Sequence, residues 1–216
     1  TLGGIMALLG IKPEVEGFWE LAAFVDVNGP HKLGQSDASA ENIRRLYAYW
    51  AWSKAHELRA PKDGGVLEVP HTFMQLAFDD IARILSDDPD MLSDGDEFKA
   101  AEATLNETSF VEESGDVIVR VAPEFVSSLY STPDGKLAKA VVAFNTKTGA
   151  ITLSFADTPT AGANARDIMQ IALGPEAGGH AGIAGSPRGR RCNLDEFRTV
   201  VEFTKFTIAL LVKWQS

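Results

Sequence analysis

The stretch "KAVVAFNTKTGAITLSFAD", Lys139 to Asp157, holds two apolar runs separated by a turn signal at Thr146 to Gly149. This pattern predicts two strands joined by a tight turn. Upstream, "DVIVRVAP" (116–123) alternates like a third strand. Helical patterns lie on both sides, at "DEFKAAEATLNETSF" (96–110), at "NARDIMQIAL" (164–173) and from about Leu194 onward. Because helices must cover the faces of such a sheet, we expect an α/β fold with a mixed sheet flanked by helices.

The residues before this sheet are predicted to be mainly helical. "GGIMALLGI" (3–11) is an apolar helical pattern, and "SAENIRRLYAYWAWSKAHEL" (39–58) places Ser39 as a helix N-cap. "SDDPDMLSDGD" (86–96) carries five aspartates, Pro89 and Gly95 without apolar periodicity. That composition is typical of a solvated linker. We therefore expect a first domain over 1–85, an acidic linker over 86–96 and a second domain over 97–216.

Composition limits the classes of protein to consider. The 216 residues are 45% hydrophobic, and 20 basic residues against 30 acidic ones give a formal charge of −10. Such a chain folds into a soluble globular protein whose field repels long polyanions, so phosphate binding would have to be local. A single cysteine, Cys192, excludes an internal disulfide framework. No apolar run approaches the length of a membrane span, and we expect a cytoplasmic protein without membrane contact.

The stretch "EAGGHAGIAGSPRGRR" (176–191) is the strongest candidate for a binding site. Its glycines allow backbone N–H groups to approach an anion closely, His180 adds a donor, and arginines can clamp a phosphate. The residues predicted to bind substrate are Gly178, Gly179, His180, Gly182, Gly185, Arg188 and Arg190. We also expect the dipole of a helix beginning nearby to favour the anion, and substitution of Gly179 to impair binding more than folding. A glycine-rich turn whose histidine bonds to backbone, followed by a solvated basic loop, is the alternative.

A resemblance to a known family adds to this interpretation. "DIMQIALGPEAGGHAGIAGSP" (167–187) resembles the terminal signature of the DHH-associated domain, in which a helix runs into a Gly-Gly-His-x-x-Ala-Ala-Gly-like segment. "ELAAFVDVNGP" (20–30) is similar to the last motif of the DHH phosphoesterase domain, a strand-like run that ends in an aspartate. That match places Asp26 at the position of a metal ligand. Without the resemblance, Asp26 could equally cap a turn before Asn28 and Gly29.

The resemblance implies chemistry with divalent metal ions. Members of this family use two manganese-type ions, Mn²⁺ or Mg²⁺, which stabilise the attacking and leaving oxygens of phosphoryl transfer. The 216 residues contain no Asp-His-His triplet, and the chain begins with Thr1. We therefore expect the C-terminal portion of a DHH-family phosphoesterase, inactive by itself because one aspartate cannot hold two ions.

Two functions follow from the sequence. The first is hydrolysis, by the complete enzyme, of a short oligonucleotide, a dinucleotide or a related small phosphate ester. The second is a non-catalytic module that binds nucleotides or single-stranded nucleic acid. A homodimer is left open as the assembly state. The remaining histidines show no metal-like spacing. Tyr47, Trp50 and Trp52 share one helical pattern, which indicates packing against the core or a partner surface rather than base stacking.

Overall fold

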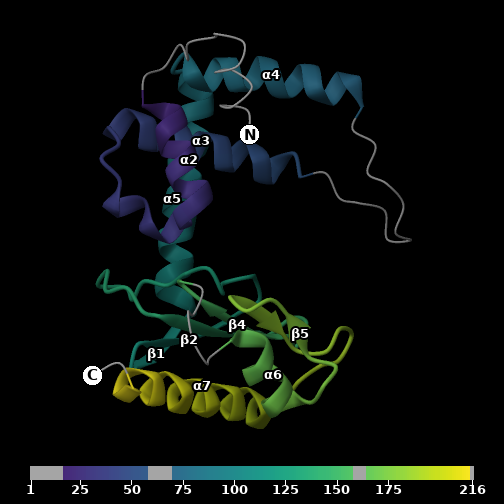
Figure 1. Cartoon of the computed structure of the whole chain (residues 1–216). Coiled ribbons are helices and arrows are strands. Elements are labelled where there is room, and N and C mark those ends of the chain that lie inside the picture. The colour runs from purple at the N-terminus through teal and green to yellow at the C-terminus, as the bar shows by residue number, and fades with distance from the viewer. Residues whose placement is uncertain (1–16, 58–69, 158–163, 215–216) are drawn as a thin grey trace. The chain divides into compact units, whose positions relative to one another are not determined.

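The computed structural model describes residues 17–57, 70–157 and 164–214. The chain divides into two compact units, Thr1–Glu102 and Ala103–Ser216. The first unit is helical, and the second contains the sheet (Figure 1). The apolar helical pattern at 3–11 lies outside the described residues.

The first unit comprises α2 (Phe18–Asn28), the 3₁₀ helix η1 (Pro30–Gln35), α3 (Ala40–Ala55), α4 (His71–Leu85) and most of α5 (Pro89–Ser109). The predicted N-cap of α3 is confirmed, since Ser39 Oγ accepts a hydrogen bond from the Asn42 N–H at 3.2 Å. The aromatic residues of α3 pack as the sequence predicts. Tyr47 and Trp50 contact the cluster around Leu21 and Leu46, and Trp52 contacts the cluster around Ile84.

The segment around Asp26 is a helix and not the strand-like run of the motif that it resembles. Phe18 and Leu21 are buried, and Val25 packs against the same cluster, so apolar residues recur at the helical spacing of three and four. Gly29, with φ of 86°, ends α2, and its N–H donates to the Val25 carbonyl at 2.8 Å. Valine is β-branched and favours strands, but the helical spacing of the buried residues outweighs this preference here.

The acidic segment 86–96 also differs from the predicted irregular linker. A turn leads into α5 at Pro89, and Asp88 Oδ1 accepts hydrogen bonds from the N–H groups of Asp90 and Met91 at 3.1 and 3.2 Å. Met91 and Leu92 are buried beside Ile84. Aspartates are favourable in the first turn of a helix because they satisfy free N–H groups there and oppose the helix dipole. The aspartates that suggested a linker begin a helix instead.

The second unit is built on one sheet whose six described strands run in the order β1-β2-β3-β4-β6-β5. Their bounds are β1 Phe110–Ser114, β2 Val117–Ala122, β3 Ala140–Asn145, β4 Ile151–Phe155, β5 Gly178–Gly179 and β6 Ile183–Gly185. The sheet is mixed, as predicted, because β2 and β3 are parallel while the other neighbouring pairs are antiparallel. The turn between β3 and β4 is also confirmed. Asn145 Oδ1 accepts from two N–H groups within it, and Gly149 has φ of 71°.

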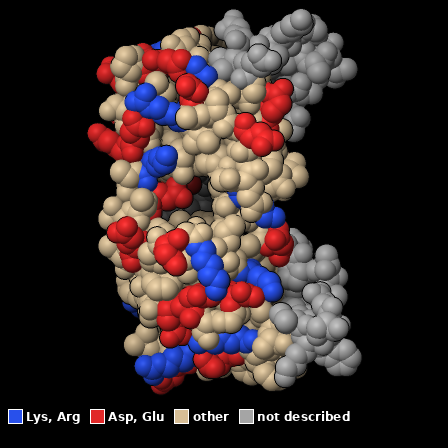
Figure 2. Space-filling view, turned by 90° about the vertical axis from the view of Figure 1, so that its left-hand side faces the viewer, with Lys and Arg blue, Asp and Glu red and all other residues tan. Residues whose placement is uncertain are grey.

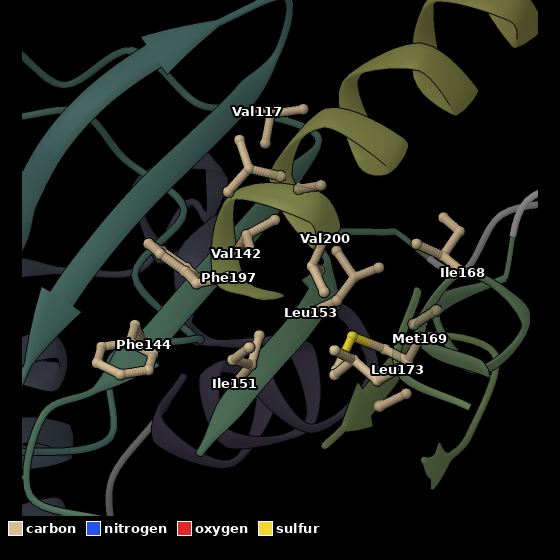
Figure 3. Close-up of a cluster of buried hydrophobic side chains, with 14 of the residues drawn as sticks. Val117, Val142, Phe144, Ile151, Leu153, Ile168, Met169, Leu173, Phe197 and Val200 are labelled. Carbon is tan, nitrogen blue, oxygen red and sulfur yellow. The ribbon is translucent and has the colours of Figure 1, made fainter. Parts of the chain in front are cut away.

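Helices α6 (Ala165–Leu173) and α7 (Leu194–Trp214) pack against one face of this sheet (Figure 1). Figure 3 shows the interior that they enclose, where Val142 and Leu153 of the strands meet Met169 of α6 and Val200 of α7. The opposite face carries Ile118, Val141 and Ala143. It is covered by the crossover segment, residues 123–139, which joins the parallel strands β2 and β3, and by the end of α5.

Candidate ligand-binding groove beside the glycine hairpin

The glycine stretch folds into a small hairpin at the edge of the sheet. Gly178 pairs with Gly185 and Gly179 with Ala184, and β6 extends the sheet by pairing with β4. The His180 N–H donates to the Ile183 carbonyl at 2.7 Å and closes the turn. The hairpin therefore brings together five of the predicted substrate residues, namely Gly178, Gly179, His180, Gly182 and Gly185.

Gly179 is required by the hairpin itself. Its φ is +152°, and a Cβ there would lie 2.3 Å from the Ile183 carbonyl oxygen and 2.5 Å from Ala184 Cα. A side chain would therefore push the two strands of the hairpin apart. The expectation that substitution of Gly179 affects binding more than folding does not fit this geometry. At Gly178, by contrast, an added Cβ would meet nothing within 4 Å.

The loop at the tip of the hairpin, Ala181 and Gly182, is held by its carbonyl groups. The Ala181 carbonyl accepts from the Ala165 N–H at the start of α6, and the Gly182 carbonyl accepts from the Phe155 N–H at the end of β4, both at 2.8 Å. Within the described part of the chain, the N–H groups of these two loop residues have no acceptor, and the His180 imidazole has no hydrogen-bond partner. Anchored in this way, the loop presents two consecutive N–H donors beside an exposed imidazole.

The arginines that follow the hairpin differ in their contacts. Arg190 donates through Nη1 to the Leu173 carbonyl at 3.1 Å and forms an ion pair through Nη2 with Glu196. It therefore joins the end of α6 to the start of α7. Arg191 donates to the Lys147 carbonyl at 2.8 Å. Arg188 is exposed and has no partner among the described residues, so it is the arginine of the three whose guanidinium is available to a ligand.

The N-terminus of α7 is also occupied by the protein's own groups. Asn193 Oδ1 accepts from the N–H groups of Asp195 and Glu196, and Glu196 Oε2 accepts from the Asn193 N–H. This reciprocal arrangement is a capping box. Because the cap and the Glu196 carboxylate satisfy this terminus, α7 does not supply the dipole that the sequence suggested for an anion.

A groove of about 300 Å³ lies beside the hairpin tip. Its lining includes Phe125, Ser127, Ser128, Tyr130, Ser154 and Gly182. Serine and tyrosine hydroxyls predominate among its polar groups, and Gly182 belongs both to the groove and to the hairpin loop. The crossover residues of this site were not predicted from the sequence. The sequence feature that could have indicated them is the run of hydroxyl residues in "FVSSLYST" (125–132), a segment without strand or helix periodicity.

The hydroxyls of Tyr130 and Ser154 bond to each other at the base of this groove. Tyr130 Oη also donates to the Phe155 carbonyl at 3.1 Å. Either hydroxyl can be the donor in the bond between them. Burial raises the pKa of the Tyr130 phenol, while the hydrogen bond with Ser154 acts in the opposite direction. Tyr130 therefore remains a neutral hydroxyl at physiological pH.

Ser127 differs from these two residues. It is completely buried, and its Oγ has no hydrogen-bond partner within the described residues. A buried hydroxyl without a partner costs about 1–3 kcal/mol relative to one that is bonded. This is the polar group of the groove with an unmet capacity to donate and to accept a hydrogen bond.

The crossover segment that carries Ser127 and Tyr130 is fixed by Arg120 of β2, whose side chain is completely buried. Its Nε donates to the Leu129 carbonyl at 2.8 Å, and its Nη2 donates to the Ser131 carbonyl at 2.5 Å. Nη1 donates to the Asn106 carbonyl and to Ser109 Oγ, both at 2.7 Å. Burial lowers the pKa of the guanidinium to about 10, which still leaves it charged at neutral pH. Arg120 thus ties the wall of the groove to α5 and to the sheet.

Asp26, the predicted metal ligand, lies on the exposed side of α2 in the first unit. Over the described ranges, no group of three or more histidine, cysteine, aspartate or glutamate side chains is close enough to hold a metal ion. Asp26 alone does not meet the need of Mn²⁺ or Mg²⁺ for several oxygen ligands in fixed geometry. The described residues therefore do not form a two-metal centre.

Comparisons with protein-family models, with curated proteins and with solved structures found no match for this chain.

In the described segments, no helix is both long enough and apolar enough to cross a membrane. On the face shown in Figure 2, acidic and basic side chains are interspersed.

Proposed function

We propose that the second unit binds a small phosphate ester, such as a nucleotide, a dinucleotide or the end of a short oligonucleotide, at the tip of the glycine hairpin. The phosphate would accept hydrogen bonds from the Ala181 and Gly182 N–H groups and from His180. Arg188 follows β6 on the side of Ile151, at the other end of the hairpin from this loop, and would attract the phosphate over a longer range. The observation that carries this proposal is the loop, which is fixed by its carbonyl groups while its N–H groups face no acceptor among the described residues. Donors held in place before the ligand arrives lose little entropy on binding.

Binding is the part of the function that these residues support directly. The resemblance to DHH-family phosphoesterases adds the proposal that the bound ester is the substrate of a metal-dependent hydrolysis. The chemistry that manganese-type ions supply in such a reaction is stabilisation of charge on the phosphoryl oxygens. In that enzyme this unit would hold and orient the phosphate, and the metal ions would require ligands in addition to Asp26. A non-catalytic nucleotide-binding module needs only the binding step.

Titration calorimetry with ribose 5-phosphate tests the binding step. We expect His180→Ala to weaken binding by about ten- to a hundredfold, because it removes a charge-assisted donor to the phosphate. Arg188→Ala should weaken binding less, because Arg188 lies at the other end of the hairpin and acts through charge over a longer range. The Arg188 contribution should decrease at high salt, since the side chain is exposed. Arg198→Ala is the matched control, because Arg198 is an exposed arginine of α7 paired with Asp195. If ribose 5-phosphate binds equally to all four proteins, the hairpin is not its site.

A further inference from the structure

We propose that the groove beside the hairpin binds an uncharged heteroaromatic ring that can both donate and accept hydrogen bonds. This inference deepens the proposed function and rests on it in one respect, that the ring and the phosphate belong to a single ligand. Gly182 makes this connection, since it lines the groove and also carries one of the N–H groups proposed to hold the phosphate.

The first support comes from Ser127. Ser127 lines the groove, and its buried Oγ lacks a partner among the described residues, whereas the Tyr130 and Ser154 hydroxyls bond to each other. A ligand that bonds to Ser127 relieves an existing penalty and does not have to displace an internal hydrogen bond. The serine hydroxyl can donate and accept, so it matches a ring edge that carries an amide, an amine or a ring nitrogen.

The second support is the absence of charge. None of the described residues that line the groove is a lysine, arginine, aspartate or glutamate. An ion placed there would lose its hydration without gaining a counter-charge, which is costly. Phosphate and carboxylate groups are therefore disfavoured in the groove and belong at the hairpin tip, where the N–H donors and His180 are available.

The third support is the aromatic rim. Phe125 lines the groove with 63% of its surface exposed, and Ile183 beside it is also exposed. An exposed phenyl ring offers a flat apolar surface that loses contact with water when another ring stacks on it. A volume of about 300 Å³ is at the small end of ligand pockets. It suits one ring system, with the remainder of the ligand outside.

The test uses isothermal titration with two neutral probes, cytidine and adenosine, and with ribose 5-phosphate, which lacks a ring base. We expect Ser127→Ala to weaken binding of at least one nucleoside by about tenfold, the loss of one hydrogen bond. Phe125→Ala should weaken the same nucleoside to a similar extent through lost stacking. Neither variant should change the affinity for ribose 5-phosphate. Ser114→Ala, which removes an exposed hydroxyl at the end of β1, is the matched control and should behave as the unsubstituted protein.

Thermal melts separate a binding role of Ser127 from a structural one. Because its hydroxyl is buried without a partner, Ser127→Ala should leave the melting temperature of the free protein unchanged or raise it. A lowered melting temperature would show that the hydroxyl makes an internal bond, and it would overturn the proposal. Unchanged affinity for both nucleosides in Ser127→Ala would overturn it as well.

The probes also separate this inference from the phosphate site. If a nucleoside binds in a Ser127-dependent way while ribose 5-phosphate does not bind, the proposal of a ring-binding groove is supported and the proposed phosphate site is wrong. If ribose 5-phosphate binds in a His180-dependent way while neither nucleoside binds, the groove proposal is wrong and the phosphate site stands. If none of the three probes binds, both proposals are overturned.

Discussion

The hairpin can form only if residue 179 has no side chain, because the facing strand approaches its backbone too closely. We expect Gly179→Ala to destabilise the second unit by about 1–3 kcal/mol, because the backbone conformation is strained for an alanine and the added Cβ would overlap the Ile183 carbonyl. Gly178→Ala is the matched control, with open space around its Cβ, and it should change stability much less. Urea unfolding followed by fluorescence gives both values. Equal midpoints for the two variants would contradict the geometry.

At the scale of single residues, the sequence indicated the glycine stretch as a candidate site but did not indicate the groove beside it. Glycines around a histidine are a local pattern, so Gly178 and His180 stand out in the sequence alone. Ser127 and Ser154 lie on the crossover and on β4, 27 residues apart in the chain, and a hydroxyl has no sequence signal until the fold shows what surrounds it. The contacts of Arg190 were not predicted for the same reason. Its partners, the Leu173 carbonyl and Glu196, come from the ends of two helices.

Among the elements, the start of α5 depends on charge. Asp88 accepts two hydrogen bonds from the Arg83 guanidinium and two from backbone N–H groups, and these bonds lower the pKa of its carboxyl below the ordinary value, with Arg83 contributing most. A lowered pKa in the folded state means that the carboxylate stabilises the fold above the unfolded-state pKa of 3.8 and that this contribution is lost as the pH falls below it.

Asp88→Asn keeps an acceptor for the helix N-terminus and removes the charge. We therefore expect a lower melting temperature than that of the unsubstituted protein at pH 7, and a difference that shrinks as the pH falls from about 4 towards 2. Thermal unfolding followed by circular dichroism across this range measures it. Asp94→Asn, at an exposed position of the same helix, controls for the general effect of removing one negative charge. A difference that stays constant with pH would contradict the assigned role.

Elements with a strong period were predicted correctly, and elements without one were not. β2, β3, β4, α3 and α6 each carry an apolar pattern of fixed spacing, and each forms as expected. β5 and β6 are short and rich in glycine, so alternation cannot reveal them, and they form because β4 offers an edge to pair with. The acidic start of α5 suggested a linker because composition alone does not show that Met91 and Leu92 face a neighbouring helix.

On the scale of the whole molecule, the hydrophobic cores are separate. Two clusters lie entirely within the first unit, between Phe18 and Leu92, and two lie entirely within the second, between Leu105 and Ile208. No described cluster of buried residues combines side chains from both units. Since burial of apolar surface is the main source of stability, each unit contains its own driving force for folding.

This separation predicts that residues 103–216 fold without the first unit. The fragment keeps both clusters of the sheet, and it keeps Asn106 and Ser109, which bond to the buried Arg120. We therefore expect a single cooperative unfolding transition with a free energy of about 5 kcal/mol, at the lower end of the range for small domains. Urea unfolding monitored by circular dichroism tests this, with the full chain measured in parallel. Arg120→Leu in the same fragment should abolish the transition or shift it to much lower urea, because the carbonyl groups that Arg120 satisfies would be left buried without donors. A fragment that shows helix and strand content but no cooperative transition would mean that the second unit depends on the first for its packing.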